Sequence, residues 1–249
     1  MLTLLSILPS IILFIVVYKG DKIEKEPSKL LWKLFWFGAL TTISAMILEQ
    51  VLSVFVLEFT YEESLIYELI DNFIITALIE EGGKYFVLKK CTWKNKAFNY
   101  TFDGVIYAVC SSLGFATLEN IFYIMGDSIE TAIMRGLLSV PGHVIDAVYM
   151  GCYYGMAKYE EAHGNTQGSK SNLKKAIFVP VLIHGFYDFC LSTHYTIFLV
   201  VFFIFEIIIT VKAVKKFKAL SKEDMMILNE ETQTITDTVL AGNGAEVKE

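Results

Sequence analysis

The sequence predicts an all-α protein, a polytopic bundle of transmembrane helices. Of its 249 residues, 54% are hydrophobic and 14% are aromatic, and the mean hydropathy is +0.50. Long uncharged runs recur along the chain, and a helix that crosses a bilayer needs about 20 such residues. This composition excludes an ordinary soluble domain. We expect a multi-pass protein of the cell membrane that contacts the lipid bilayer and has no nucleic acid partner.

Seven apolar runs are long enough to span a membrane, and each predicts one helix. The first run has no basic segment before it and no small-residue cleavage site after it, so it predicts a retained helix rather than a signal peptide. Together the runs indicate one transmembrane domain over residues 1–220. The predicted spans are residues 2–18, 30–57, 65–88, 102–125, 130–157, 176–193 and 195–214.

The loops between these runs separate by charge. Lysines follow the first, third, fifth and seventh runs, whereas residues 58–64, 126–129 and 193–194 contain no Lys or Arg. By the positive-inside rule, the N-terminus lies outside and the C-terminus is cytoplasmic. The polar residues 160–171 predict a mobile loop, and the acidic, aromatic-poor residues 221–249 predict a disordered cytoplasmic tail.

Ionisable residues interrupt the third apolar run at Glu80, Glu81 and Lys84. Each ionisable group at bilayer depth costs at least about 2.5–3.5 kcal/mol, so such residues usually face the protein interior and mark a functional site. Glu80 and Lys84 are four residues apart and share a helix face, in the order that favours an ion pair. Other helices should therefore bring polar groups to meet them.

Three later runs carry polar residues to a similar depth. Glu119 shares a helix face with Phe115, four residues before it. His184 and Asp188 of the sixth run have the same spacing and also share a face. With a rise of 1.5 Å per residue, all of these positions fall within about 8 Å of the middle of their spans. The polar residues of these runs are Glu119, His143, Asp146, His184 and Asp188.

Carboxylates and imidazoles that meet in an apolar bundle favour water activation. A carboxylate desolvated among other acids becomes a usable general base, and an imidazole can donate a hydrogen bond to an oxyanion. Two histidines with two or three carboxylates are also suitable ligands for Zn²⁺ or a similar metal. The sequence has no HExxH motif, and its four cysteines form no CxxC pair, so neither a zincin helix nor a thiolate metal site is expected.

At these residues the sequence resembles the PrsW family of intramembrane proteases, which is related to the CAAX prenyl endopeptidases. The family motifs EExxK, FxxxE(N) and HxxxD resemble the segments 80–84, 115–120 and 184–188. A further family histidine resembles His143 in the segment PGHVIDA. The resemblance covers about residues 65–195, and the acid at Glu119 is similar to PrsW rather than to the prenyl endopeptidases.

The resemblance implies a site made of catalytic and supporting residues. It implies that Glu80 is the general base and that Glu119 helps to hold the water or a metal. It assigns the catalytic set Glu80, Glu81, Glu119, His143, His184 and Asp188, with Lys84, Asn120 and Phe115 in support. The residue types do not decide whether one divalent metal such as zinc is bound; its candidate ligands are Glu119, His143, His184 and Asp188.

The resemblance also implies the substrate, a single-pass membrane protein. By analogy it is an anti-sigma factor, whose first cut starts the release of an extracytoplasmic-function sigma factor. The competing interpretations are a prenyl-peptide endopeptidase, a proton- or cation-coupled transporter, a scaffold that holds a partner helix, and a buried polar network that only fixes helix packing.

Six further positions have structural rather than catalytic interpretations. We expect Glu49 and Glu206 to pair with polar groups of the bundle, and Arg135 and Asp71 to lie near the outer surface. The spacing of Gly151 and Gly155 predicts close helix packing inside the bundle.

Overall fold

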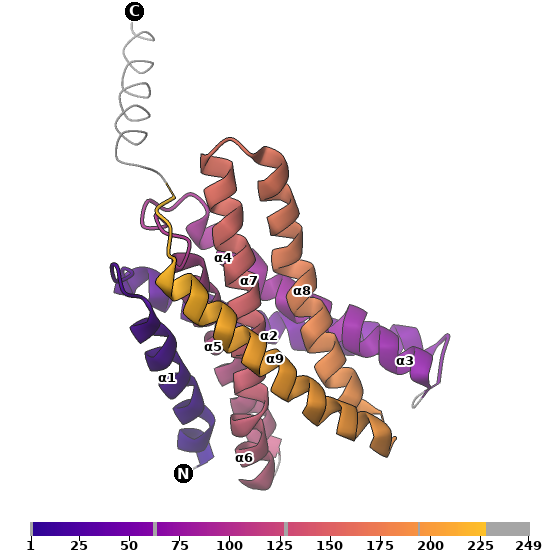
Figure 1. Ribbon diagram of the computed structural model, residues 1–249. Helices are drawn as coiled ribbons and strands as arrows, with labels where there is room; N and C mark the ends of the chain where they lie inside the picture. Colours follow the sequence, from indigo (N-terminus) through magenta and orange to yellow (C-terminus); the bar gives the residue numbers. More distant parts are fainter. Residues whose placement is uncertain (1, 62–63, 127–128, 194, 228–249) are drawn as a thin grey trace, which may run out of the picture.

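The computed structural model describes residues 2–61, 64–126, 129–193 and 195–227, which form a bundle of helices (Figure 1). Within these residues the only β-structure is an isolated bridge between Tyr100 and Met226, so the predicted all-α class is confirmed. The elements in chain order are α1 (Leu2–Gly20), α2 (Ser28–Leu57), α3 (Leu65–Leu69), η1 (Ile70–Ala77), α4 (Leu78–Thr92), α5 (Asp103–Gly126), α6 (Ile129–Leu137), α7 (Ser139–Ala162), α8 (Thr166–Ser192) and α9 (Thr196–Lys222).

Helix α5 forms the centre of the bundle. Four of the described helices, α2, α5, α8 and α9, are long and apolar enough to cross a membrane, and α1 adds a shorter apolar stretch. In the apolar part of α5, 78% of the residues are buried, compared with 11% in α2 and 11% in α9. The outer faces of α2 and α9 therefore present their large apolar side chains to the surroundings, as helices in contact with lipid do.

Glycines allow α2 and α7 to approach α5 on two sides. A Cβ atom at Gly114 of α5 would lie 1.9 Å from the carbonyl oxygen of Phe35 in α2. On α7, a Cβ atom at Gly155 would lie 2.0 Å from the carbonyl oxygen of Thr101, just before α5, and one at Gly151 would lie 2.4 Å from the Cα of Val105. Gly151 and Gly155 thus pack closely inside the bundle, as predicted.

The third predicted span contains a π-helix. Ser64 caps α3 by accepting a hydrogen bond from the backbone N–H of Tyr67 at 3.1 Å, and the chain then continues through η1 into α4. Helix α4 is unbroken at Gly82 and Gly83 and extends to Thr92, four residues beyond the predicted end of the span. Because π-helical turns are rare and often occur at functional sites, η1 is notable for leading directly into Glu80.

The prediction of one helix over residues 130–157 is wrong. Helix α6 ends at Leu137, and α7 begins at Ser139 after Leu138, whose φ of −116° departs from the helical value. Pro141 then falls in the first turn of α7, where its missing N–H leaves no hydrogen bond unmade. The short helix α6 lies at the lower end of the bundle in Figure 1.

The prediction of a mobile loop over residues 160–171 is also wrong. Helices α7 and α8 extend into this stretch and leave only a tight turn over residues 163–165. Gly164 adopts a positive φ of 77°, which a glycine adopts without strain. Asn165 caps α8 by accepting a hydrogen bond from the N–H of Gly168 at 2.9 Å. The polar composition thus belongs to helix ends that project beyond the apolar part of the bundle.

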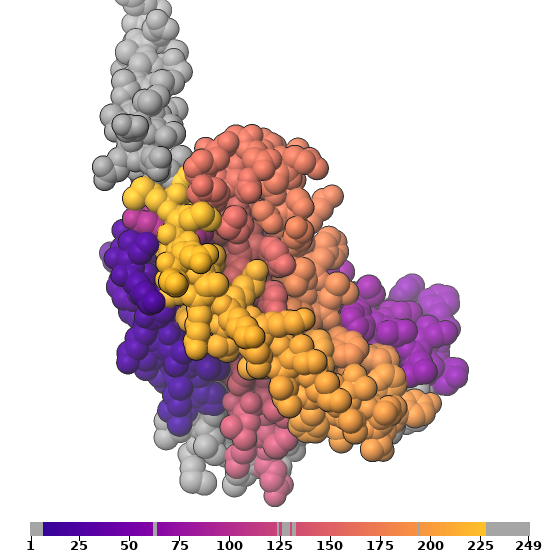
Figure 2. Space-filling model, in the orientation of Figure 1, coloured from indigo at the N-terminus to yellow at the C-terminus, as the bar shows by residue number. Residues whose placement is uncertain are grey.

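Helix α9 lies obliquely across α7 and α8, and the chain after it returns to the bundle (Figure 2). The backbone N–H of Ile227 donates to Asn99 at 2.7 Å, and that of Thr101 donates to Met225 at 3.0 Å. Ile227 is buried in the hydrophobic core. Residues 223–227 of the predicted tail are therefore packed against the loop before α5, while residues 228–249 lie outside the described residues.

Candidate active site

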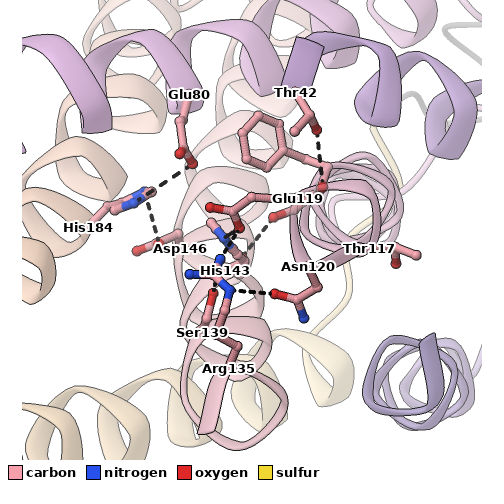
Figure 3. Close-up of polar contacts among 12 residues, drawn as sticks. Thr42, Glu80, Thr117, Glu119, Asn120, Arg135, Ser139, His143, Asp146 and His184 are labelled. Atoms are coloured by element: carbon pink, nitrogen blue, oxygen red, sulfur yellow. Dashed lines mark hydrogen bonds and ion pairs between the residues drawn. The ribbon is translucent and has the colours of Figure 1, made fainter. Parts of the chain in front are cut away.

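A cavity of about 780 Å³ opens inside the bundle. Its wall is formed by α2, η1, α4, α5, α6, α7, α8 and α9, so residues far apart in the sequence meet there (Figure 3). Six of the predicted site residues line it: Glu80, Phe115, Glu119, His143, His184 and Asp188. The other three, Glu81, Lys84 and Asn120, are buried behind this wall.

Adjacent carboxylates on α4 have different surroundings. Lys84 lies one turn further along and places its ammonium 3.1 Å from Oε2 of Glu80 and 2.7 Å from Oε1 of Glu81. Glu80 is 4% exposed and lines the cavity, whereas Glu81 is 0% exposed. Helix geometry thus presents Glu80 to the cavity and holds Glu81 in the core, and the ammonium of Lys84 contacts both carboxylates.

His184 of α8 lies between two carboxylates. Its Nδ1 is 3.0 Å from Oε1 of Glu81, and its Nε2 is 3.0 Å from Oδ2 of Asp188. Both ring nitrogens donate only in the charged imidazolium, which is the form that two ionised carboxylates favour. Glu80 lies further away, 3.8 Å from Nε2 (Figure 3). The ring is thereby fixed at the cavity wall with its orientation set from both sides.

His143 of α7 links the lysine to the acid of α5. Its Nδ1 lies 3.0 Å from the ammonium of Lys84, and its Nε2 lies 3.1 Å from Oε2 of Glu119. The same ammonium lies 4.1 Å from the centre of the Phe115 ring, within the range of a cation–π contact. The three motifs and His143 are therefore joined in one continuous network of contacts.

The expectation that Arg135 lies near the outer surface is corrected. Its guanidinium points inward and lies 2.7 Å from Oε2 of Glu119, while its Nε donates to Oδ1 of Asn120 at 3.0 Å (Figure 3). It also stacks over Tyr123 at 3.7 Å and lines the cavity. Arg135 thus pairs with residues of α5 inside the bundle.

Three acids of the cavity wall have surroundings that the sequence does not signal. Asp146 has one oxygen 3.8 Å from His184 and the other buried without a hydrogen-bond partner. Glu49 and Glu206 line the cavity, but neither has a hydrogen bond or an ion pair with the described residues, so their predicted polar pairing is wrong. In the sequence, only the mid-span position of Glu49 and Glu206 indicates that they lie inside the bundle.

A further acid, Asp71, accepts a hydrogen bond from Ser53 at 2.5 Å and also lines the cavity.

A donor group for a metal ion is present in the described residues, but it differs from the expected set. Its four donor atoms lie within 4.8 Å of one another and belong to Glu80, Glu81, His143 and His184. Glu119 is instead turned toward Arg135, and Asp188 lies at the nitrogen of His184 that faces away from Glu81. Two carboxylates and two imidazoles are suitable ligands for Zn²⁺.

Two observations bear on whether these residues fit a divalent cation. Glu81 has a buried oxygen without a hydrogen-bond partner, as does Asp146 beside it, so donor capacity is left over. Lys84 contacts three of the four ligands, Glu80, Glu81 and His143, and therefore competes with a metal for them. The donor types and the oxygens without a hydrogen-bond partner fit a metal ion. Its binding requires the ammonium of Lys84 to move away from Glu80, Glu81 and His143.

Comparisons with known proteins identify the family of the chain. The family model "PrsW family intramembrane metalloprotease" matches residues 26–212. Protease PrsW of Clostridioides difficile (strain 630) is 35% identical over 212 residues, covering 84% of this chain and 86% of that protein. Protease PrsW of Oceanobacillus iheyensis is 34% identical over 220 residues, covering 87% and 96%. Protease PrsW of Bacillus subtilis (strain 168) is 31% identical over 195 residues, covering 75% and 81%.

No solved structure shows a significant match to the chain. The family model covers most of the chain, and the relatives are matched over most of their own length. Together with the long apolar helices, these matches establish a multi-pass, membrane-embedded peptidase. The chain belongs to the PrsW family of intramembrane metalloproteases.

Proposed function

We propose that this protease hydrolyses a peptide bond of a single-pass membrane protein inside the cavity, with water activated by Glu80. The observation that supports this most strongly is the meeting of Glu80, Glu119 and His184 on the wall of one cavity of about 780 Å³. That volume accommodates a short stretch of peptide, since ligand cavities commonly range from about 300 to 1,000 Å³.

Glu80 rather than Glu81 is the general base in this proposal. A base must come within hydrogen-bond distance of the water that it deprotonates. Glu80 lines the cavity, whereas Glu81 is 0% exposed and its Oε1 already accepts from Lys84 and His184. Glu81 therefore acts as a positioning residue, which fixes the ring of His184 and the ammonium of Lys84.

The remaining residues handle charge and protons during hydrolysis. Glu80 takes a proton from water as the water oxygen bonds to the scissile carbonyl carbon, and the proton passes to the leaving nitrogen as the C–N bond breaks. His184, held as an imidazolium by Glu81 and Asp188, places a positive charge at the cavity wall that stabilises the oxyanion electrostatically. Glu119, held by His143 and Arg135, orients the water.

The residues that would hold a metal are Glu80, Glu81, His143 and His184. When bound, a divalent metal supplies Lewis-acid polarisation of the carbonyl and makes a water molecule more acidic. With or without a metal, the chain itself positions the peptide and shields the site from bulk water, because the site residues are mostly buried.

An anti-sigma factor is the substrate proposed by resemblance to the family. A single-pass substrate is supported by the architecture, because α2 and α9, which both contribute to the cavity wall, are largely exposed on their outer faces. A partner helix in the bilayer can therefore approach the cavity from the side without displacing the central helix α5.

Cleavage of a tagged single-pass anti-sigma factor in reconstituted vesicles tests the proposal. Glu80→Gln keeps the shape of the side chain and an acceptor for Lys84 but removes the base. We expect it to lower kcat by about 10²- to 10⁴-fold, the usual contribution of a general base. Glu58→Gln, an equivalent change at the exposed end of α2, is the matched control.

Each outcome has a defined meaning. Loss of cleavage in Glu80→Gln and His184→Ala, with full cleavage in Glu58→Gln, supports the proposed site. Cleavage that persists in Glu80→Gln rejects Glu80 as the base. Chelation of the wild-type protein, followed by metal analysis and by re-addition of Zn²⁺, shows whether the four-residue donor group is loaded in the working enzyme.

A further inference from the structure

Helix α2 presents a polar stripe to the cavity. The lining residues of this helix recur at intervals of three and four, which places them on one face; they are Thr42, Ala45, Met46, Glu49, Gln50 and Ser53. The other faces of α2 carry exposed apolar side chains such as Leu48 and Val51. A polar face on an otherwise lipid-facing helix indicates contact with something other than lipid.

Glu49 is the charged member of this stripe, and no described residue neutralises it. Its Oε1 is buried without a hydrogen-bond partner, and no Lys, Arg or His lies within ion-pair distance of either oxygen. A carboxylate within an apolar span is unfavourable unless it is paired. The stripe therefore contains an acid whose partner is missing from the protein itself.

The depth of Glu49 follows from the packing of α2 on α5. The hydroxyl of Thr42 donates to the carbonyl oxygen of Phe115 at 3.1 Å, which aligns these two positions. Both helices run the same way, so Glu49 lies seven residues beyond this contact and Glu119 lies four residues beyond it. The difference of three residues places Glu49 about 4.5 Å further toward the end of α2 that lies opposite the lysine-rich loops.

The cavity as a whole has more acids than bases. Its acidic lining residues are Glu49, Asp71, Glu80, Glu119, Asp146, Asp188 and Glu206. Arg135 is the only arginine or lysine that lines it in the described part of the chain, and it is already paired with Glu119. Asp146, which is 3% exposed, also has an oxygen without a partner. A ligand that enters this cavity meets more carboxyl groups than cationic side chains.

We propose that Glu49 forms a subsite for the side chain of a substrate lysine or arginine close to the cut bond. Glu119 orients the water in the proposed reaction and so marks the depth of the cut bond. An extended peptide advances about 3.3 Å per residue, so the offset of about 4.5 Å between Glu49 and Glu119 corresponds to one or two residues from that bond. A basic side chain at that place supplies the missing partner of Glu49 and is itself neutralised inside the bilayer. The subsite rests on the proposed peptide hydrolysis and adds a preference for basic substrates.

Cleavage and binding of a matched peptide series test this subsite. The series is one transmembrane peptide with Lys, Arg, Gln, Leu or Glu at each of the two positions on that side of the cut. For the wild-type protein we expect Lys and Arg to raise kcat/KM at least about tenfold over Gln, the lower range for close charge pairs. Glu49→Gln should abolish this preference, and Glu49→Lys should transfer it to the Glu peptide.

The outcomes separate this subsite from the proteolytic function. Equal cleavage of all peptides by wild-type protein overturns the subsite but leaves the protease intact. If no peptide is cut, photo-crosslinking of the same peptides to Glu80→Gln protein decides: a preference for Lys and Arg that Glu49 controls supports the subsite, and equal capture overturns it. Glu58→Gln, which carries the same charge change outside the cavity, should leave every preference unchanged.

Discussion

Lys84 and His143 lie on different helices, and the ammonium of Lys84 approaches Nδ1 of His143 to 3.0 Å. An ammonium group has hydrogens to donate and no lone pair to accept with. Nδ1 must therefore be the acceptor, which leaves the ring neutral with its proton on Nε2, where it is donated to Glu119. The lysine thus sets the tautomer of a histidine that its own helix does not carry.

Replacement of Lys84 by methionine should affect stability as well as activity. The change removes one of the two cationic partners of Glu81, which is fully buried, and leaves only His184 beside it. Removal of one partner from a buried ion pair typically lowers the free energy of unfolding by about 3–5 kcal/mol. Unfolding in detergent measures this loss, with the exposed Lys90→Met on the same helix as control. Equal midpoints for the two variants would contradict a structural role of the lysine.

Replacement of Arg135 should separate charge from geometry at Glu119. Arg135→Met removes both the ion pair and the hydrogen bond to Asn120, whereas Arg135→Lys keeps only the charge. We expect kcat/KM to fall about tenfold for methionine, an effect of about 1.4 kcal/mol, and by less for lysine. The peptide cleavage assay measures both values. Unchanged kinetics in Arg135→Met would show that His143 alone holds the acid.

Alanine at two glycines should have opposite effects on stability. At Gly114 the new Cβ would lie 1.9 Å from the carbonyl oxygen of Phe35, so α2 and α5 must separate. Overpacking of this kind typically costs about 1–3 kcal/mol. At Gly82 nothing lies within 4 Å, and alanine should stabilise the helix by about 0.5–1 kcal/mol. Thermal unfolding of both variants provides the comparison; a stable Gly114→Ala variant would contradict the close approach.

The stability of the loop between α1 and α2 should depend on pH through Glu26. Burial raises the pKa of its carboxyl from 4.5 to about 7, although the hydroxyl of Tyr107 donates to it. The native state therefore holds this proton more tightly than the unfolded chain. Its contribution to stability is complete below pH 4.5, decreases as the pH rises, and is lost above about pH 7.

Thermal unfolding between pH 4 and pH 8 measures this effect. Glu26→Gln should flatten the curve in the window between the two pKa values, because it removes the titrating group. Glu24→Gln, at an exposed position of the same loop, should retain the wild-type slope. The same slope in Glu26→Gln would assign the pH dependence to other groups.

The membrane class and the meeting of the site residues follow from simple properties of the sequence. Apolar runs fix which segments are helices, and polar residues at one depth must find each other in a bundle. The spacing of Glu80 and Lys84 predicts their ion pair because four residues are about one helical turn. These features depend on distances along the chain, which a sequence displays directly.

The features that the sequence did not show depend on the rotation of one helix relative to another. The position of Arg135 near one end of the predicted span 130–157 indicates the outer surface, whereas the structure pairs its guanidinium with Glu119 of α5. The π-helix η1 has no compositional signature, since its i→i+5 bonding uses the same apolar residues as an α-helix. The sequence predicts a polar partner for Glu49 within the bundle, and only the three-dimensional packing shows that Oε1 of Glu49 has no hydrogen-bond partner among the described residues.

The pairing of residues 223–227 with the loop before α5 has a consequence for biosynthesis. These residues hold the end of α9 against the ends of other helices: Asp224 accepts hydrogen bonds from Thr101 and Phe102, and Ser221 donates to Gly20. A ribosome makes this segment only after α1, α5 and all the helices between them. The nascent bundle therefore stays open at its lysine-rich end until residues 223–227 have been made, and a truncation before Ile227 would prevent its closure.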